Sequence, residues 1–201
     1  MKALSLLPIA GIAAFLCLYV AAAMLYPGGT KFNATTSGFS ITDNFWCDLL
    51  DEPAYNGQTN PGRPYAMAAM ITLSGALLAF WNAAPTIFPD RRRTGWICRI
   101  AGSLSAVLMI FIFTRYHHQI INVAGGLGIA ALAAVLTGLA ATGERRLVAL
   151  AAASLALIGV NFYIWQTEHG LSVLPLIQKV SFLQVFYWIA AVSWRARIRR
   201  S

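Results

Sequence analysis

Long apolar runs alternate with short polar segments along most of the chain. A helix needs about 20 mostly apolar residues to cross the hydrocarbon core of a bilayer. Six runs approach or exceed that length, and Pro-, Gly-, Arg- or His-containing segments separate them. We therefore predict an all-α integral membrane protein, a single domain built as a six-transmembrane-helix bundle. The predicted spans are residues 4–26, 65–84, 96–114, 120–141, 147–165 and 171–194.

The composition agrees with this prediction. Hydrophobic residues make up 58% of the 201 residues and charged residues only 11%, whereas soluble domains carry about 25% charged residues. The net charge of +8 would suggest a nucleic-acid partner in a soluble protein. Its distribution along the chain has a simpler explanation, so no nucleic-acid partner is expected.

Basic residues mark the cytoplasmic side of short membrane loops. The ends of the predicted spans separate into two groups, and one group holds eleven basic residues against Asp90 and Glu144. The other group holds three basic residues against five acidic ones. This asymmetry predicts that both termini are cytoplasmic. The eleven basic residues are Lys2, Arg91, Arg92, Arg93, Arg99, Arg145, Arg146, Arg195, Arg197, Arg199 and Arg200.

The first predicted span has one competing interpretation. Ala21-Ala22-Ala23 lies near its end and resembles a signal-peptidase site after a short basic start. The apolar run is longer than the 7–15 residues of a typical signal core, which favours an uncleaved helix. Cleavage stays open as the alternative and would leave five helices.

Residues 27–64 form an outer loop that is too long for a simple turn. The loop mixes aromatic and apolar residues with few charges, which does not describe a disordered tether. We predict a structured loop that folds back onto the bundle, with Phe45, Trp46 and Leu49 inserted and Asp48 pointing inward. Pro64 is well placed to begin the second helix.

Small residues allow helices to approach closely in lipid. The fourth and fifth predicted spans are rich in Gly and Ala, so we predict that these two helices form the tightly packed centre. The third and sixth contain more large aromatic and aliphatic residues, and we expect them to face lipid.

Lys179 is the one charged residue deep inside the sixth predicted span, eight residues from Leu171, or about 12 Å along the helix. A charge at that depth requires an internal partner or an aqueous cavity. With continuous helix, Glu168, Ser172 and Pro175 would share one face with Lys179. Facing spans offer further polar residues, including Thr72 and Ser74.

These residues predict a polar cavity that opens outward under the loop. The same residues could instead form hydrogen bonds that only hold the helices together, and the sequence leaves both possibilities open. The predicted lining is Asp48, Arg63, Arg115, His118, Asn122, Asn161, Glu168 and Lys179.

Metal chemistry is the alternative interpretation of the outer side. All three histidines lie there with most of the carboxylates, and both residue types bind zinc and act as general acids or bases. No HExxH-like spacing is present, and the three cysteines form no CxxC pair. No cofactor is expected in the main interpretation, and zinc is expected in the alternative. Its ligands would come from His117, His118, His169 and Asp48.

The pattern GFS…NFWCDLL…NGQ.NP.RP.A…M, followed by an apolar span, resembles prokaryotic membrane proteins of the domain-of-unknown-function family 998. That family is distantly similar to six-helix membrane proteins that include the damage-regulated autophagy modulators and the GPI-lipid-remodelling factors. The resemblance implies a six-helix bundle in the bacterial cytoplasmic (inner) membrane, a structured first outer loop and lipid-related work. It transfers no catalytic residues, although Asp48 is the acidic position that we would carry over.

Three hypotheses about function follow. The leading one is a protein that binds a lipid or other amphiphile in the outward-facing polar cavity, with Arg63 or Arg115 holding a phosphate or carboxylate head group. The second is an intramembrane hydrolase or transferase that uses the metal site or, less directly, Ser74 as a nucleophile. The third is a structural or assembly subunit that contacts a membrane-protein partner or forms a homo-oligomer.

Overall fold

A computed structural model describes residues 6–199. Within this range the chain contains six α-helices and no β-strand, with one isolated bridge between Gly28 and Ser37. The all-α prediction is therefore confirmed for the described residues. Lys2, Arg200 and the first two residues of span 4–26 lie outside them. The elements are α1 (Leu7–Leu25), η2 (Trp46–Leu50), α2 (Arg63–Ala83), η3 (Ala84–Ile87), α3 (Arg92–Met109), α4 (His117–Ala141), α5 (Arg145–Thr167), η4 (Leu171–Val173) and α6 (Leu174–Arg199).

Five helical segments are long and apolar enough to cross a membrane. The exception is α3, whose 18 residues include Arg92, Arg93 and Arg99. The chain is therefore a multi-pass membrane protein by length and composition. The five segments are Leu7–Leu25, Arg63–Ile87, His117–Ala141, Arg145–Thr167 and Leu171–Arg199.

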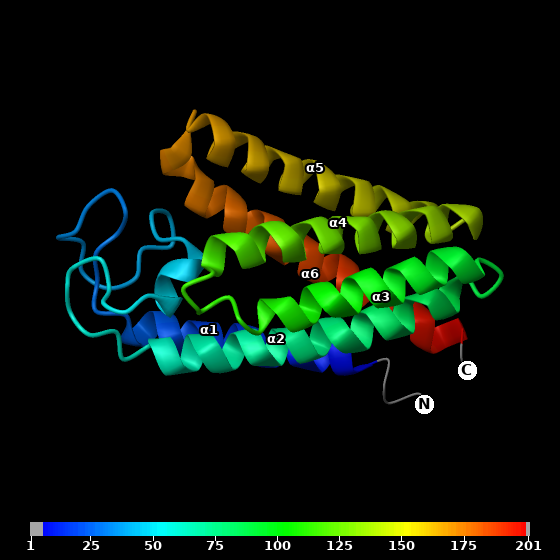
Figure 1. The fold of residues 1–201 in the computed structure, drawn as a ribbon, viewed down its shortest axis with the longest axis horizontal. Helices are drawn as coiled ribbons and strands as arrows, with labels where there is room; N and C mark the ends of the chain where they lie inside the picture. Colours follow the sequence, from blue (N-terminus) through cyan, green and yellow to red (C-terminus); the bar gives the residue numbers. More distant parts are fainter. Residues whose placement is uncertain (1–5, 200–201) are drawn as a thin grey trace.

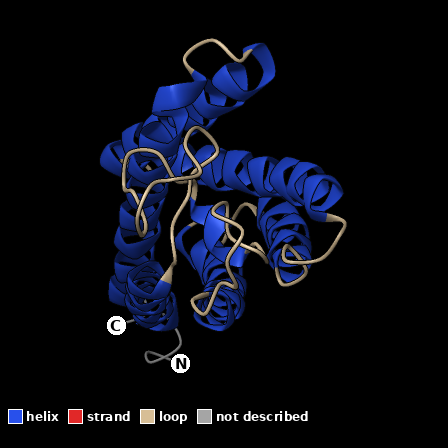
Figure 2. Ribbon diagram, turned by 90° about the vertical axis from the view of Figure 1, so that its left-hand side faces the viewer, coloured by secondary structure: helices blue, strands red, loops and turns tan. Residues whose placement is uncertain are grey.

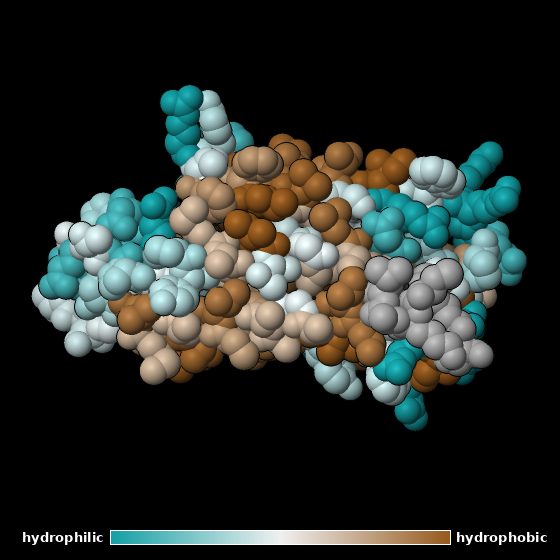
Figure 3. All heavy atoms as spheres, turned by 90° about the horizontal axis from the view of Figure 1, so that it is seen from below, coloured by the Kyte–Doolittle hydropathy of each residue, from teal (hydrophilic) through white to brown (hydrophobic). Residues whose placement is uncertain are grey.

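The helices run roughly along the long axis of the molecule and give it two distinct ends (Figure 1). One end holds the long loop between α1 and α2, together with the α5–α6 connection. The other end holds the start of α1, the α2–α3 and α4–α5 turns and the end of α6. Figure 2 looks onto the first end and shows the loop crossing in front of the helix ends. Between the ends, the surface in Figure 3 is a hydrophobic band flanked by hydrophilic residues.

The packed centre does not lie where the small residues predicted it. Half of the α2 segment is buried but only 22% of α5, so the prediction that α4 and α5 form the centre is wrong. Phe15 of α1, Phe80 of α2 and Trp188 of α6 are each at most 1% exposed, and the Phe80 and Trp188 rings lie 5.4 Å apart. Large side chains fill the space where α1, α2 and α6 meet, because alanine and glycine bury too little surface to do so.

Two helix boundaries differ from the prediction in a way that matters for the outer residues. The third helix ends at Met109, and α4 begins at His117 rather than at residue 120. The sixth helix begins at Leu174 rather than at residue 171. Glu168 and Gly170 both adopt positive φ angles, 57° and 79°, which interrupt the helical path. Glu168 and Ser172 therefore precede the α6 helix, and the predicted common face with Lys179 is reduced to Pro175.

Candidate functional site

Residues 26–62, which we name the cap, form an ordered structure on one end of the bundle, as the sequence predicted. The chain reverses at Gly28 and Gly29, whose φ angles of 129° and 83° suit glycine and strain other residues. Gly29 N–H donates to the Thr36 carbonyl (2.7 Å), and Asn56 N–H donates to the Gly28 carbonyl (3.3 Å). These bonds give the cap its own backbone scaffold.

Trp46 attaches the cap to two helices of the bundle. Its ring stacks on Phe182 of α6 at 5.1 Å, with only 7° between the ring planes. On the other side it lies 5.6 Å from Phe15 and 5.1 Å from Tyr19 of α1, and the Tyr19 hydroxyl donates to its carbonyl (3.3 Å). Leu49 is fully buried. The predicted insertion of this segment is confirmed.

Asn44 lies at the centre of the polar contacts beneath the cap and is fully buried. Its side-chain amide donates to the Gly29 carbonyl and to Asp48 Oδ2, both at 2.9 Å. Its side-chain oxygen accepts from Ser40 N–H at 2.9 Å. Its backbone carbonyl accepts a hydrogen bond from Lys179 Nζ. One residue thus connects the first turn of the cap, the acid at position 48 and the lysine of α6.

Lys179 is only 7% exposed and has the internal partners that its position in a span requires. Besides the Asn44 carbonyl, its ammonium donates to the Pro175 carbonyl one turn earlier (3.1 Å). The ring of Phe39, from the cap, covers it at 5.5 Å. Since α6 begins at Leu174, Lys179 lies about 8 Å from the helix start and reaches the cap directly.

Asp48 points inward as predicted and is 2% exposed. Besides the bond from Asn44, its Oδ2 accepts from Phe45 N–H at 2.9 Å. Burial raises the pKa of Asp48 to about 6, against the lowering effect of these hydrogen bonds and of the charge on Lys179. No ion pair links Asp48 to Lys179 in the described residues, so Asn44 separates the two charges.

Asn60 and Arg63 complete the polar contacts at the far side of the cap. The Asn60 amide donates to the carbonyls of Leu49 and Asp51, each at 3.1 Å, and Arg63 Nε donates to the Leu50 carbonyl (2.9 Å). These are the carbonyls at the end of η2, which have no partner within that helix. Arg63 therefore holds the cap in place, and its Nε is engaged by the backbone.

The predicted lining residues separate into distinct locations. Arg115, His118 and Asn122 are exposed at the capped end of α4. Arg115 Nη2 donates to the neighbouring Tyr116 hydroxyl (2.8 Å), whereas His118 and Asn122 have no side-chain hydrogen bond within residues 6–199. Asn161 bonds to the Ser181 hydroxyl (2.6 Å) and joins α5 to α6. Glu168 is exposed at the end of α5.

The residues proposed for metal binding do not assemble. Residues 6–199 contain no group of three or more His, Cys, Asp or Glu side chains placed to hold a metal ion. His117 Nδ1 lies 2.7 Å from the Ile112 carbonyl, and His169 Nδ1 lies 2.9 Å from the Thr167 carbonyl. The Ser74 hydroxyl is buried without a hydrogen-bond partner, whereas an activated serine needs a base within hydrogen-bond reach.

The outward surface of the cap carries the acids. Asp51 and Glu52 line a shallow hollow of about 470 Å³ together with Tyr55. Burial raises the pKa of Asp51, and the charges of His117 and Arg63 act in the opposite direction. The cap therefore presents an acidic outer face, in contrast to the arginines at the other end of the molecule.

The sequence analysis did not select Asn44 or Asn60, although their side chains make more hydrogen bonds than those of the residues that it selected. Both are at most 2% exposed. A signal was present, since each asparagine lies beside a predicted buried or turn segment, where Asn side chains commonly bind backbone groups. Which carbonyls they reach depends on contacts across the loop, and the sequence contains no information about those.

The chain matches no protein-family model, no curated protein and no solved structure.

Proposed function

We propose that this protein binds a lipid or other amphiphile along an exposed face of α4, whose polar end near the cap holds Arg115, His118 and Asn122. The enclosed-cavity version of the hypothesis is less well supported, because Lys179 and Asp48 already bind Asn44. This face of α4 includes two predicted lining residues, His118 and Asn122, whose side chains make no hydrogen bond within residues 6–199.

One observation carries the proposal: polarity changes along a single exposed face of α4. His118, Asn122, Gly126 and Ile129 follow near-helical spacing and lie on one side of the helix, and all four are exposed. A side chain added at Gly125 or Gly126 would meet no atom within 4 Å. Along this face, polar side chains are followed by glycines that leave open space and then by an apolar residue. An amphiphile has the same order, with a polar head group followed by an apolar tail.

The position of α5 leaves this face accessible. In Figure 1, α4 and α5 lie close together near their connecting turn and separate toward the capped end. The contacts that hold α5 are mostly to α6: Trp188 Nε1 donates to the Leu147 carbonyl (3.0 Å), and Asn161 bonds to Ser181. An exposed Asn at membrane depth is costly unless it meets a polar partner, and a lipid head group supplies one.

The proposal includes six spans with the cap outside and both termini in the cytoplasm. The arginine-rich segments supply the asymmetry that orients membrane proteins. It counts α3 as a span, since its 18 residues are about 27 Å long. The resemblance to domain-of-unknown-function family 998 extends the proposal to the bacterial inner membrane and to lipid-related work, and both remain predictions.

Photo-crosslinking tests lipid binding along this face of α4. The purified full-length chain in nanodiscs that contain a phospholipid with a photoactivatable acyl chain is irradiated, and labelled peptides are quantified by mass spectrometry. Gly126→Leu fills the open space and should lower labelling of α4 by about fivefold or more, since loss of about 1 kcal/mol of contact is worth fivefold. Asn122→Leu removes a polar contact for the head group and should also lower labelling of α4.

Gly75→Leu is the matched control, because Gly75 is an exposed helical glycine on α2 that also has no atom within 4 Å of an added side chain. It should leave labelling of α4 unchanged. Equal labelling of α4 in wild type and Gly126→Leu would refute the proposal. If Gly126→Leu instead dissociates an oligomer without changing lipid labelling, this face of α4 is a protein–protein interface and the chain is a structural subunit.

A further inference from the structure

A pocket of about 560 Å³ lies at the end of the molecule opposite the cap, between the α2–α3 turn and the start of α3. Its apolar walls are Pro85, Phe88 and the indole of Trp96. Gly95 forms part of the wall as well, and a methyl group there would lie 3.3 Å from Pro85 Cβ. The glycine thus lets α3 pack closely against Pro85 at the wall of the pocket.

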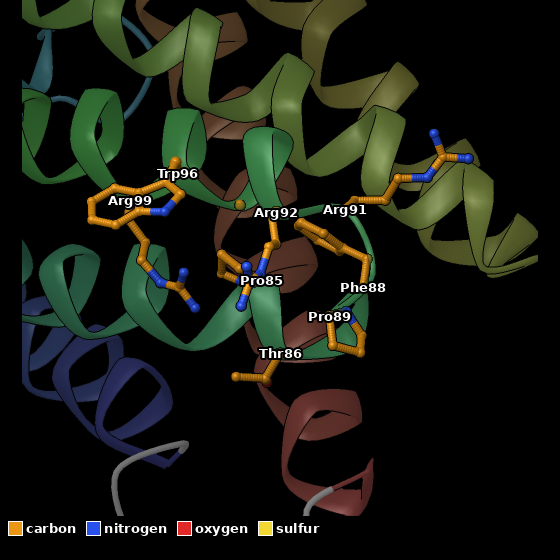
Figure 4. Close-up of a pocket in the computed structure, with 9 residues that line it drawn as sticks. Pro85, Thr86, Phe88, Pro89, Arg91, Arg92, Trp96 and Arg99 are labelled. Carbon is orange, nitrogen blue, oxygen red and sulfur yellow. The ribbon is translucent and has the colours of Figure 1, made fainter.

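Three arginines give this pocket a strongly positive lining, and two of them face into it. Arg92, Trp96 and Arg99 follow i, i+4 and i+7 and share one face of α3. Figure 4 shows the Arg92 and Arg99 side chains extending toward the same region near Pro85 and Thr86, whereas Arg91 points away toward a neighbouring helix. No acidic residue lines the pocket.

These guanidinium groups lack partners in the described chain. Arg195 and Arg199, at the same end, bind Glu144, but Arg92 and Arg99 make no ion pair and no side-chain hydrogen bond within residues 6–199. The nearest acid in sequence, Asp90, is exposed and lies outside the pocket lining. Two like charges that face one space repel each other, and an anion between them removes that repulsion.

We infer that this pocket binds the phosphate of an anionic phospholipid, with Arg92 and Arg99 on the phosphate and Trp96 against the glycerol and the first acyl carbons. Guanidinium donors match phosphate oxygens in pairs, which an ammonium group does not do. The indole of Trp96 is 62% exposed, and tryptophan is enriched at the level of lipid head groups. The site is separate from the exposed face of α4 and does not depend on it.

Native mass spectrometry of the detergent-purified full-length chain tests the inference. The protein is titrated with phosphatidylglycerol and, separately, with phosphatidylcholine at 0.15 M salt, and retained lipids are counted. The wild type should retain phosphatidylglycerol preferentially, and Arg92→Gln/Arg99→Gln should weaken that retention by about tenfold or more. Both arginines lie at the surface, so the double variant should elute as the wild type does in size exclusion.

Two further double variants distinguish a specific phosphate site from a general effect of positive charge. Arg145→Gln/Arg146→Gln removes the same charge at the same end, outside the pocket, and should change retention by less than about twofold, since exposed charges are screened at this salt concentration. Arg92→Lys/Arg99→Lys keeps the charge but loses the paired donors, and should still weaken retention several-fold. Equal losses in the two glutamine variants would overturn the inference.

Soluble competitors identify the source of the phosphate. Millimolar inorganic phosphate or glycerol phosphate should leave phosphatidylglycerol bound, because neither makes the apolar contacts with Trp96. Displacement by inorganic phosphate would show that the pocket takes a free anion, and the lipid assignment would be wrong. Equal labelling of α4 in wild type and Gly126→Leu, together with normal phosphatidylglycerol retention, would refute the function proposed above and leave this site unaffected.

Discussion

The two ends of the bundle hold their charges in opposite ways. At the capped end, Lys179 and Asp48 are buried and separated by Asn44, which bonds to both. At the arginine-rich end, the acid and its partners meet directly and nearer water: Glu144 lies 2.6 Å from Arg195 and 3.5 Å from Arg199, whose side chains are 38% and 33% exposed. Arg199 also donates to the Ile87 carbonyl (2.6 Å), so this contact joins α5, α6 and η3.

The difference indicates different roles for charge. A buried charge without its hydrogen bonds is strongly destabilising, so the cap and α6 must stay together for Lys179 to remain satisfied. An exposed ion pair contributes little and weakens with salt. The capped end should therefore behave as a rigid unit, and the arginine-rich end should tolerate change and interact with charged surroundings.

The largest expected effect comes from Lys179→Met. The substitution leaves the Asn44 carbonyl without its charged donor and Asp48 without a nearby positive charge, which should destabilise the contact between the cap and α6 by about 2–4 kcal/mol. Limited proteolysis should then cut within residues 27–64 much faster than in the wild type, while the helical fragments stay intact by circular dichroism.

Lys31→Met is the matched control for this prediction. Lys31 is an exposed lysine of the cap that lies 5.0 Å from the centre of the Trp165 ring, and its loss should cost less than about 1 kcal/mol. If the two methionine variants are cleaved at the same rate, the buried lysine does not hold the cap and the contrast between the two ends fails.

A second, slightly smaller effect is expected from pH, through Asp48. Its pKa in the folded chain is raised to about 6 from an ordinary value of 3.8, so the folded state binds the proton more tightly than the unfolded state. This contribution to stability is complete below about pH 4 and is lost as pH rises through about 6. Lys179 of α6 and Asp51 of the cap are the charged groups that influence Asp48.

Asp48→Asn keeps a hydrogen-bond acceptor for Asn44 and Phe45 and carries no charge at any pH. The variant should be more stable than the wild type by about 2–3 kcal/mol at pH 7.5, and by about 1 kcal/mol or less at pH 4.5. Thermal unfolding followed in detergent at both pH values measures this. A wild-type advantage at pH 7.5 would show that the ionised carboxylate stabilises the cap.

The smallest expected effect lies at the arginine-rich end. Glu144→Gln removes the ion pairs with Arg195 and Arg199 and should lower the free energy of unfolding by about 0.5–1 kcal/mol at low salt. The difference from the wild type should shrink at 0.5 M NaCl because the pairs are partly exposed. Asp90→Asn serves as the control, because Asp90 is an exposed acid in the neighbouring turn that makes no ion pair within residues 6–199. A salt-independent loss exceeding about 2 kcal/mol in Glu144→Gln would contradict the comparison.

Much of this architecture could be predicted from the pattern of apolar and polar residues within single segments. Apolar run length identified the helices, because the cost of leaving backbone groups unpaired in lipid permits little else across a bilayer. Aromatic residues within the first loop predicted that it packs onto the bundle, and Trp46, Leu49 and Asp48 do so. A lysine inside a span required an internal partner, and Lys179 has one.

The identity of the partners needed the tertiary structure. Lys179 binds a backbone carbonyl 135 residues away in sequence, and backbone carbonyls are present at every position, so no residue type marks the one that is chosen. The position of the packed centre was likewise visible only in the structure: Phe15, Phe80 and Trp188 are buried there, whereas the Gly- and Ala-rich fourth and fifth spans were expected to form it.

The sequence by itself thus determined that the chain is helical and membrane-suited, and that it has a folded loop and two ends of opposite charge, because these follow from composition within single segments. Only the tertiary structure decided that the polar residues of the outer side divide between a hydrogen-bonded cap and an exposed face of α4. It also decided that Arg92 and Arg99 face one pocket. Each of these depends on the angle at which one helix leaves its neighbour, which is set by packing between segments distant in sequence.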